Sequence, residues 1–214
     1  MNAEEPEAEV LAVTRRSLHA VAELVMAGPQ YRTSGTIRLR VVPGGFRTVA
    51  APELRVEGDA LVAGGGVRVP LDGRTPREVG AAAGVEPGAP ENLYHDGSGA
   101  LADDVLGVDS TAAGYLTRCL VSGDEALRRL APEATPVLWP EHFDLGITVD
   151  EINYGVSLGD GYLGVPYAYV GPWEVRTGEF WNAPFGAARP LSDLHDLHGF
   201  FAEGQERAAT DGRK

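Results

Sequence analysis

The chain has a single cysteine among its 214 residues, and the scarcity limits what it can be. Cys119 has no second cysteine with which to form a disulfide within the chain. Its place on the apolar side of an expected helix indicates a small packing residue rather than a reactive thiol. Lysine is equally scarce, because Lys214 is the only one, so arginine carries almost all of the positive charge.

The chain has few positively charged residues: it contains 18 basic and 31 acidic residues, which gives a formal net charge of −13. Binding to nucleic acid needs a basic patch that neutralises phosphates, and an anionic membrane surface attracts basic segments in the same way. No run of the sequence forms such a patch, and the pair Arg38/Arg40 lies among neutral residues. We therefore expect neither nucleic acid nor a membrane as a partner.

Long apolar runs are absent as well. No stretch approaches the ~18 apolar residues of a transmembrane helix, and residues 1–7 lack the basic and apolar regions of a signal peptide. The sequence therefore predicts a soluble, cytoplasmic protein. It contains no P-loop and no glycine-rich dinucleotide motif, and Gly64–Gly66 is expected to connect two strands, so no cofactor is expected.

The sequence is rich in turn-forming residues, with 28 glycines and 15 prolines, which is typical of many short elements. Alternating apolar residues predict strands at 36–42, 46–49, 54–57, 60–63 and 67–70, and later at 142–149 and 167–170. Helical spacing predicts helices at 8–26, 76–83, 110–130 and 191–206. The expected signals at their ends are Gly28-Pro29 after the first, Thr75, Glu78 and Gly84 around the second, and Asp109 or Ser110 before the third.

Strands grouped apart from helices favour an α+β fold. We expect one domain over residues 9–205, in which antiparallel β-sheets, an N-terminal meander and a C-terminal sheet, pack with about four helices. A division into two subdomains meeting near residue 133 is the alternative. Residues 1–8 and 206–214 are polar and expected to be flexible tails.

Residues 137–186 hold all three tryptophans and four of the seven tyrosines, together with several polar residues. Ligand pockets are aromatic and apolar with a few converging polar groups, so we expect a small-molecule pocket here. The expected ligand-binding residues are Trp139, Glu141, Asn153, Tyr154, Tyr167, Tyr169, Trp181 and Asn182. Asn182 is notable because an amide in an apolar stretch needs backbone or ligand partners.

The sharpest local feature is the run WPEHFD at residues 139–144. If a strand covers 142–149, His142 and Asp144 project from one face, about 6.6 Å apart. A carboxylate beside an imidazole fixes its tautomer and raises its basicity, which suits a general base. One hypothesis is therefore an enzyme with His142 as base and Asp144 as its orienting partner. The alternative is a hydrogen-bonded pair that only covers a sheet face.

Two other kinds of chemistry can be weighed from the sequence. In a metal-assisted enzyme, His142 and Asp144 would be joined by His95, Asp160 or Glu179, but regular ligand spacing is missing and no metal ligand is assigned. Residues 193–198 carry two Asp and two His on an expected helix, where a solvated face is the simpler interpretation. Residues 155–159 match the nucleophile elbow G-x-S-x-G, but residues 160–166 cannot form the helix that this motif needs.

The alternative from a different functional class is a non-catalytic binding or assembly module. Aromatic residues are enriched in the centres of protein interfaces, so the aromatic segment could join two copies of the chain in a homodimer.

The C-terminal half resembles a group of actinobacterial proteins through four runs: WPEHFD at 139–144, NYGVS at 153–157, YVGPW at 169–173 and FWNAPFGA at 180–187. More distantly, residues 15–205 look like a domain-of-unknown-function family with the same order of parts. Those parts are here His19, Ile37/Leu39, Phe143–Leu145 and Tyr167/Tyr169. The resemblance supports the expected architecture and implies no activity, substrate or cofactor.

Overall fold

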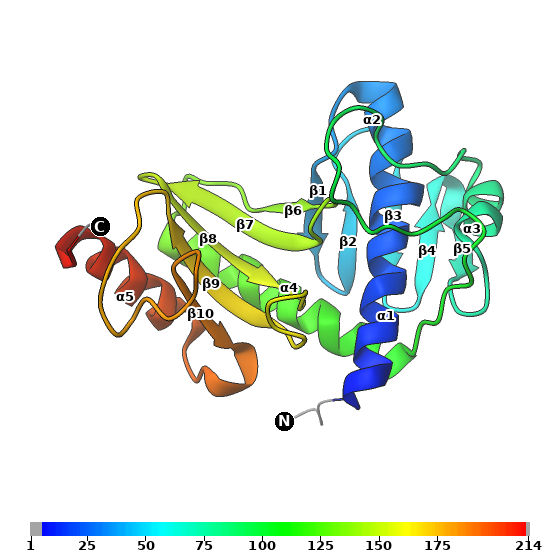
Figure 1. The fold of residues 1–214 in the computed structure, drawn as a ribbon. Coiled ribbons are helices and arrows are strands. Elements are labelled where there is room, and N and C mark those ends of the chain that lie inside the picture. Colours follow the sequence, from blue (N-terminus) through cyan, green and yellow to red (C-terminus); the bar gives the residue numbers. More distant parts are fainter. Residues whose placement is uncertain (1–5, 213–214) are drawn as a thin grey trace.

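The computed structural model describes residues 6–212, and their strands join in one antiparallel sheet (Figure 1). The strands are β1 Leu39–Val42, β2 Gly45–Thr48, β3 Leu54–Glu57, β4 Ala60–Ala63, β5 Val67–Pro70, β6 Val137–Trp139, β7 Asp144–Val149, β8 Ile152–Ser157, β9 Tyr167–Pro172 and β10 Ala187–Pro190. Their order across the sheet is β10-β9-β8-β7-β6-β1-β2-β3-β4-β5. The α+β class is confirmed, and the two expected sheets are halves of one sheet, joined where Leu39 of β1 pairs with Leu138 of β6.

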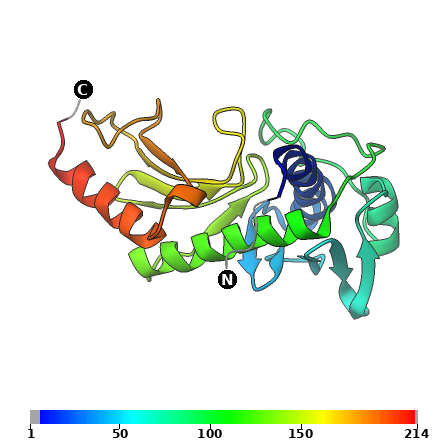
Figure 2. The same cartoon turned by 90° about the horizontal axis from the view of Figure 1, so that it is seen from below.

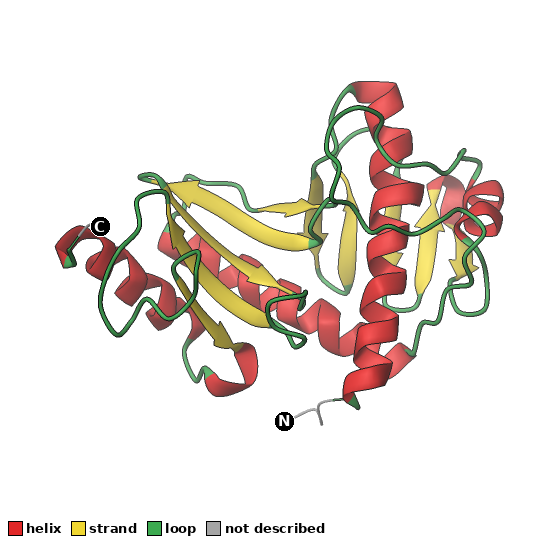
Figure 3. Cartoon of the chain, viewed as in Figure 1, coloured by secondary structure: helices red, strands yellow, loops and turns green. Residues whose placement is uncertain are grey.

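Figure 3 distinguishes the helices of the described residues from the strands by colour. They are α1 Ala8–Ala20, α2 Gly28–Ser34, α3 Pro76–Ala83, α4 Ser110–Leu130 and α5 Leu197–Thr210, with a π-helical segment η1 Val21–Ala27 and the 3-10 turns η2 Gly64–Gly66 and η3 Leu191–Asp193. Since α1, η1 and α2 follow one another without a break, they form one rod. Within residues 6–212 no helix combines the length and apolar character needed to cross a bilayer.

The predicted starts of α3 and α4 are confirmed by their caps. The Thr75 hydroxyl accepts the Glu78 N–H at 3.2 Å, and the Glu78 carboxylate accepts the Thr75 N–H at 2.9 Å. Gly84, with φ of 73°, ends α3. The Asp109 carboxylate accepts the Ala112 N–H at 2.8 Å, which satisfies a donor that the first turn of α4 leaves free.

The prediction that Gly28-Pro29 ends the first helix is wrong, because the helix widens into π turns before it reaches them. The Gly28 N–H bonds to Glu23 O, which leaves Leu24 O to accept the N–H of Gly88 at 2.8 Å. Pro29, which has no N–H, fits at the start of α2. A β-carbon on Gly28 would lie 1.6 Å from Gly88 O, so the approach of this loop requires glycine.

The first strand also begins later than predicted, at Leu39 rather than residue 36. The cause is the buried side chain of Gln30, whose amide nitrogen donates to Thr36 O at 3.0 Å and to Arg38 O at 2.9 Å. Carbonyls that are used in this way are not available to a neighbouring strand.

The last helix is shifted toward the C-terminus relative to the prediction. Asp196 caps α5 by accepting the Gly199 N–H at 3.0 Å, so the helix starts at Leu197 and not at residue 191. It continues to Thr210, which places residues 206–210 of the predicted tail in a helix. Residues 1–5 and 213–214 of the predicted tails lie outside the described residues.

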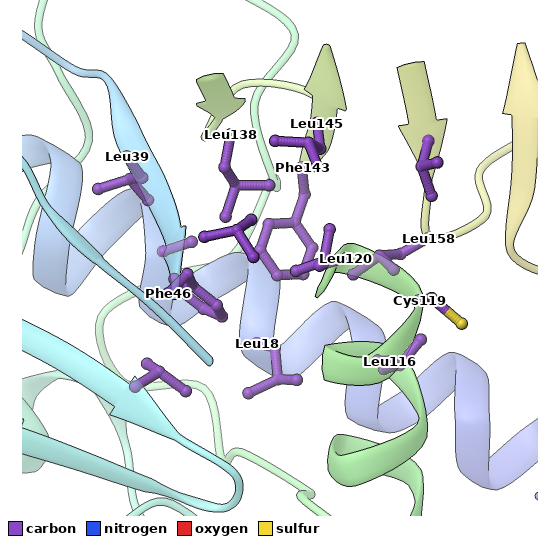
Figure 4. Packing of buried hydrophobic residues seen from close by; sticks show 14 of the residues in the cluster. Leu18, Leu39, Phe46, Leu116, Cys119, Leu120, Leu138, Phe143, Leu145 and Leu158 are labelled. Atoms are coloured by element: carbon purple, nitrogen blue, oxygen red, sulfur yellow. The ribbon is translucent and has the colours of Figure 1, made fainter. Parts of the chain in front are cut away.

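One face of the sheet carries the helices and a single hydrophobic core. Figure 2 shows α4 passing along the C-terminal strands and reaching the N-terminal half. Figure 4 shows Leu18 of α1 and Leu116 of α4 meeting Phe46 and Phe143 between the two halves. A β-carbon on Gly123, in the middle of α4, would lie 2.8 Å from Val156 Cγ2. This glycine therefore lets α4 pack closely on β8.

The opposite face of the N-terminal half presents arginines. The register sets Arg40 beside Arg47 and Arg47 beside Arg55, with Arg68 two strands further on. Glu57 pairs with both Arg55 and Arg68, whereas Arg40 and Arg47 form no ion pair within the described part of the chain. This row joins arginines from four different strands, so no run of the sequence reveals it, and the expectation that nucleic acid is not a partner stays a prediction.

Candidate functional site

In the C-terminal half, the same open face of the sheet forms a pocket of about 650 Å³. Its lining comes from β7, β8, β9, the turn before β7, the loop between β8 and β9, and the segment between β9 and β10. The lining residues are His142, Asp144, Asn153, Ser157, Asp160, Tyr167, Tyr169, Gly171, Pro172, Trp173, Val175, Arg176, Trp181, Ala183, Pro184, Phe185 and Gly186.

A hydrogen bond between two side chains forms the floor of this pocket. The Tyr169 hydroxyl, from β9, donates to Asp144 Oδ2, on β7, at 2.5 Å. The Tyr169 ring crosses β8 at Gly155, where a β-carbon would lie 2.4 Å from the hydroxyl oxygen. A β-carbon on Gly146 would lie 3.0 Å from the same atom. The two glycines therefore leave the space in which Tyr169 reaches Asp144.

The walls are aromatic. Phe185 lies edge-on to Tyr162 at 5.0 Å and to Tyr169 at 6.5 Å between ring centroids. Trp181 donates its indole N–H to Asp211 at 2.9 Å, which holds the segment after β9 against the end of α5. Trp173 is 63% exposed and stands at the rim.

The loop of residues 158–166 borders the pocket on the side of α1. Asp160 accepts the hydroxyl of Tyr167 at 2.6 Å and the N–H of Tyr162 at 2.8 Å, which orders the loop. Arg15 of α1 donates to Gly164 O at 3.0 Å. Asp160 and His142 also border a second hollow of about 470 Å³ beside α1. After Ser157 the chain continues through this loop into β9, so no helix follows the G-x-S-x-G run.

Burial controls the ionisation of the polar groups at the floor. It raises the pKa of the Asp144 carboxyl, although the Tyr169 hydrogen bond opposes this. Burial, followed by the nearby Asp144, raises the pKa of Tyr169 well above its ordinary value. The pKa of Tyr167 is raised by burial and by Asp160. Both tyrosines are therefore hydrogen-bond donors throughout the neutral pH range.

The prediction that one strand presents His142 and Asp144 on the same face is wrong. β7 begins at Asp144, and Phe143 has a left-handed backbone with φ of 52°, which interrupts the alternation of a strand. Phe143 turns into the core, where its ring stacks on His19 at 5.3 Å. His142 is left at the rim, with Nε2 3.3 Å from Glu141 Oε1.

Six of the predicted site residues line the pocket: His142, Asp144, Asn153, Tyr167, Tyr169 and Trp181. Asp144 takes its hydrogen bond from Tyr169, so Tyr169 and not His142 is its observed partner. Asn153 Oδ1 accepts the Thr148 hydroxyl at 2.7 Å.

The structure places the other four predicted residues elsewhere. Tyr154 is fully buried on the opposite face, edge-on to Phe201 of α5 at 6.2 Å, because its neighbours Asn153 and Gly155 take the pocket side of β8. Asn182 bonds to the backbone of Ala188 in both directions, at 3.1 and 3.0 Å. It is therefore satisfied by β10 and not by a ligand.

Trp139 and Glu141 lie beside the pocket without lining it. Trp139 packs under the guanidinium of Arg38, 5.7 Å from the ring centroid. Glu141 lines the second hollow, beside His19. Trp139 ends β6, where it pairs with Asp144, and Glu141 lies in the turn between β6 and β7.

Several lining residues were not predicted, among them Ser157, Trp173, Arg176 and Phe185. For Ser157 a signal exists, because alternation along β8 from Asn153 through Gly155 leads directly to it. Trp173, Arg176 and Phe185 lie in the irregular segment between β9 and β10, where no periodicity indicates which side chains turn inward.

Metal binding was the third hypothesis from sequence. Among residues 6–212, no three His, Cys, Asp or Glu side chains come together as a group that could hold a metal ion. The combination of His142 and Asp144 with His95, Asp160 or Glu179 is thus not assembled as a ligand set.

Comparisons of the chain with protein-family models, with curated proteins and with solved structures find no match. The resemblance described from its sequence runs therefore stays a prediction.

Proposed function

We propose that the protein binds a small organic molecule in the pocket over β7, β8 and β9. The observation that carries the proposal is the floor: a shielded carboxyl of Asp144 and the hydroxyl of Tyr169 meet at the bottom of a hollow with aromatic walls. Small-molecule sites combine an apolar, aromatic lining with a few convergent polar groups. The volume of about 650 Å³ suits a ligand of this kind.

The same geometry supports an enzymatic version of the proposal. A carboxyl whose pKa is raised by burial, placed in a pocket, is a typical proton-transfer group. Asp144 would exchange a proton with the bound molecule, Tyr169 would orient that carboxyl, and His142 would act from the rim. This assignment keeps His142 and Asp144, which were predicted from the sequence, but Asp144 is paired with Tyr169 instead of His142.

The test is a fragment screen by saturation-transfer NMR, followed by titrations monitored by tryptophan fluorescence. Trp173 and Trp181 line the pocket and Trp139 does not, so ligands should change the emission of the wild type. We expect Trp173→Ala to weaken aromatic hits by about three- to tenfold, since one ring contact is lost.

Leu101→Ala is the matched control, because Leu101 is 68% exposed and lies in the loop before α4. The proposal fails if no fragment binds, or if Trp173→Ala and Leu101→Ala bind the hits as the wild type does. Chemical change of a bound hit in the NMR sample, abolished by Asp144→Asn, would support the enzymatic version.

A non-catalytic assembly module is the second candidate, and the exposed rim favours it. Trp173, Tyr162 and Val175 are 63%, 45% and 53% exposed. Light scattering at increasing protein concentration distinguishes the two functions. A dimer that Trp173→Ala dissociates supports assembly, whereas a monomer at all concentrations argues against it.

A further inference from the structure

The floor of the pocket contains an acceptor with no donor. Asp144 Oδ2 receives the Tyr169 hydroxyl, but Oδ1 is shielded from solvent and has no hydrogen-bond partner among the described residues. Leaving a buried carboxyl oxygen unpaired costs stability, and native structures rarely do so without a reason. A ligand that brings a donor to this atom would remove the cost.

No arginine or lysine of the described chain pairs with Asp144; His142, which also lines the pocket, is the group of positive sign near its carboxyl. Arg176 is the one arginine among the lining residues, and its donors go to Ala208 O at 2.9 Å and Glu174 O at 2.9 Å. Its remaining ionic contact is with the Glu174 carboxylate at 3.5 Å. The second carboxylate of the lining, Asp160, is occupied by Tyr167. Neither Asp144 nor Asp160 is therefore in an ion pair with an arginine among the described residues.

The aromatic walls of the pocket also favour a positively charged ligand. Trp173, Trp181 and Phe185 line the same pocket as Asp144, and the faces of aromatic rings attract cations. A carboxylate at the floor with aromatic rings above it matches a protonated amine that carries an apolar body.

We propose that the pocket selects organic cations, and that Asp144 Oδ1 receives an N–H of a protonated amine whose apolar body lies between Trp173, Trp181 and Phe185. This inference rests on the proposed small-molecule site and specifies its ligand class. A neutral ligand of the same shape lacks the charge that the shielded carboxylate attracts, and an anionic one is repelled.

The test uses three probes that share a phenyl ring and differ in charge: phenethylamine, 2-phenylethanol and phenylacetate. Affinities are measured at neutral pH by NMR titration of the full chain. We expect phenethylamine to bind about tenfold more tightly than 2-phenylethanol, and phenylacetate to bind most weakly. Asp144→Asn should reduce the advantage of the amine over the alcohol to about twofold or less.

Asp103→Asn is the matched control, because Asp103 pairs with Arg77 on the surface and should leave the preference unchanged. Tyr169→Phe is the second variant and is used if Asp144→Asn does not fold. It keeps the carboxylate and should keep the preference for the amine.

The inference is overturned if the alcohol binds as well as the amine, or if the preference survives in Asp144→Asn. If all three probes bind equally well and Trp173→Ala weakens all of them, the result supports the proposed small-molecule site and contradicts only its preference for cations. If none binds, the site itself is lost.

Discussion

The hydrogen bond between Asp144 and Tyr169 exists because residue 155, which lies between them on β8, has no side chain. A β-carbon at residue 155 would occupy the path of the Tyr169 ring. Residue 28 must also be glycine because the backbone of Gly88 approaches it closely, and not because the chain turns there.

We expect Gly155→Ala to lower the free energy of unfolding by about 1–3 kcal/mol, because the added methyl group overpacks a rigid strand. It should also abolish the fluorescence response to ligands, since Tyr169 must move. Urea titration of the unfolding transition measures the first effect. Gly161→Ala is the control: nothing lies within 4 Å of its β-carbon position, so stability should change little. Equal stability of the two variants would contradict the role of Gly155.

His19 gives a prediction for pH. Burial lowers its pKa from the ordinary value of 6.5, so the unfolded chain binds a proton more readily than the folded chain does. The stability contributed by neutral His19 is complete above the unfolded pKa and is lost as the pH falls from there toward the folded pKa.

The free energy of unfolding should therefore rise between about pH 5 and pH 7. His19→Gln should flatten this rise, whereas replacement of the exposed His195 by Gln should keep the wild-type slope. Urea unfolding at several pH values is the measurement, and equal slopes for all three proteins would refute the assignment.

At the scale of elements, the register of strands β1, β2 and β3 places arginines side by side, where their charges repel one another. Like charges directly opposite on neighbouring strands destabilise a sheet, and Arg47 stands between Arg40 and Arg55. Glu57 offsets the charge on Arg55 and Arg68 but leaves Arg40 and Arg47 without an ion pair among the described residues.

We expect Arg47→Thr to raise the free energy of unfolding by about 0.2–1 kcal/mol at low salt, because it relieves this repulsion and keeps a residue that favours strands. The gain should shrink in 1 M salt, where charges are screened. Arg68→Thr, which loses the 3.0 Å pair with Glu57, should show no gain. Equal gains in both variants would mean that strand propensity, and not charge, explains the effect.

At the scale of the whole molecule, α4 connects the two halves of the sheet. Leu116 and Leu120 belong to the same core as Phe46 of the first half and Leu145 of the second. A single core shared in this way predicts one cooperative transition rather than two subdomains that unfold separately near residue 133.

The three tryptophans all lie in the C-terminal half, so their fluorescence reports on that half, whereas far-ultraviolet circular dichroism reports on all helices and strands. We expect the two signals to give the same urea midpoint and the same slope. Two separate midpoints would show that the halves unfold independently.

The sequence by itself determined the elements whose signals are local. The strands at 54–57, 60–63 and 67–70 and the helix 110–130 have the predicted bounds, because alternation, helical spacing and caps depend only on neighbouring residues. Local pattern also indicated the segment that forms the pocket and six of its lining residues.

Only the tertiary structure decided how these pieces combine. At η1, Leu24 O bonds to Gly88, which is distant in sequence, and after the turn at Phe143 the ring of this residue stacks on His19. The arginine row and the Asp144–Tyr169 pair likewise join residues from different strands. Such contacts are set by the register of the strands and by packing between elements. Neither the register nor the packing produces a periodic pattern along the sequence.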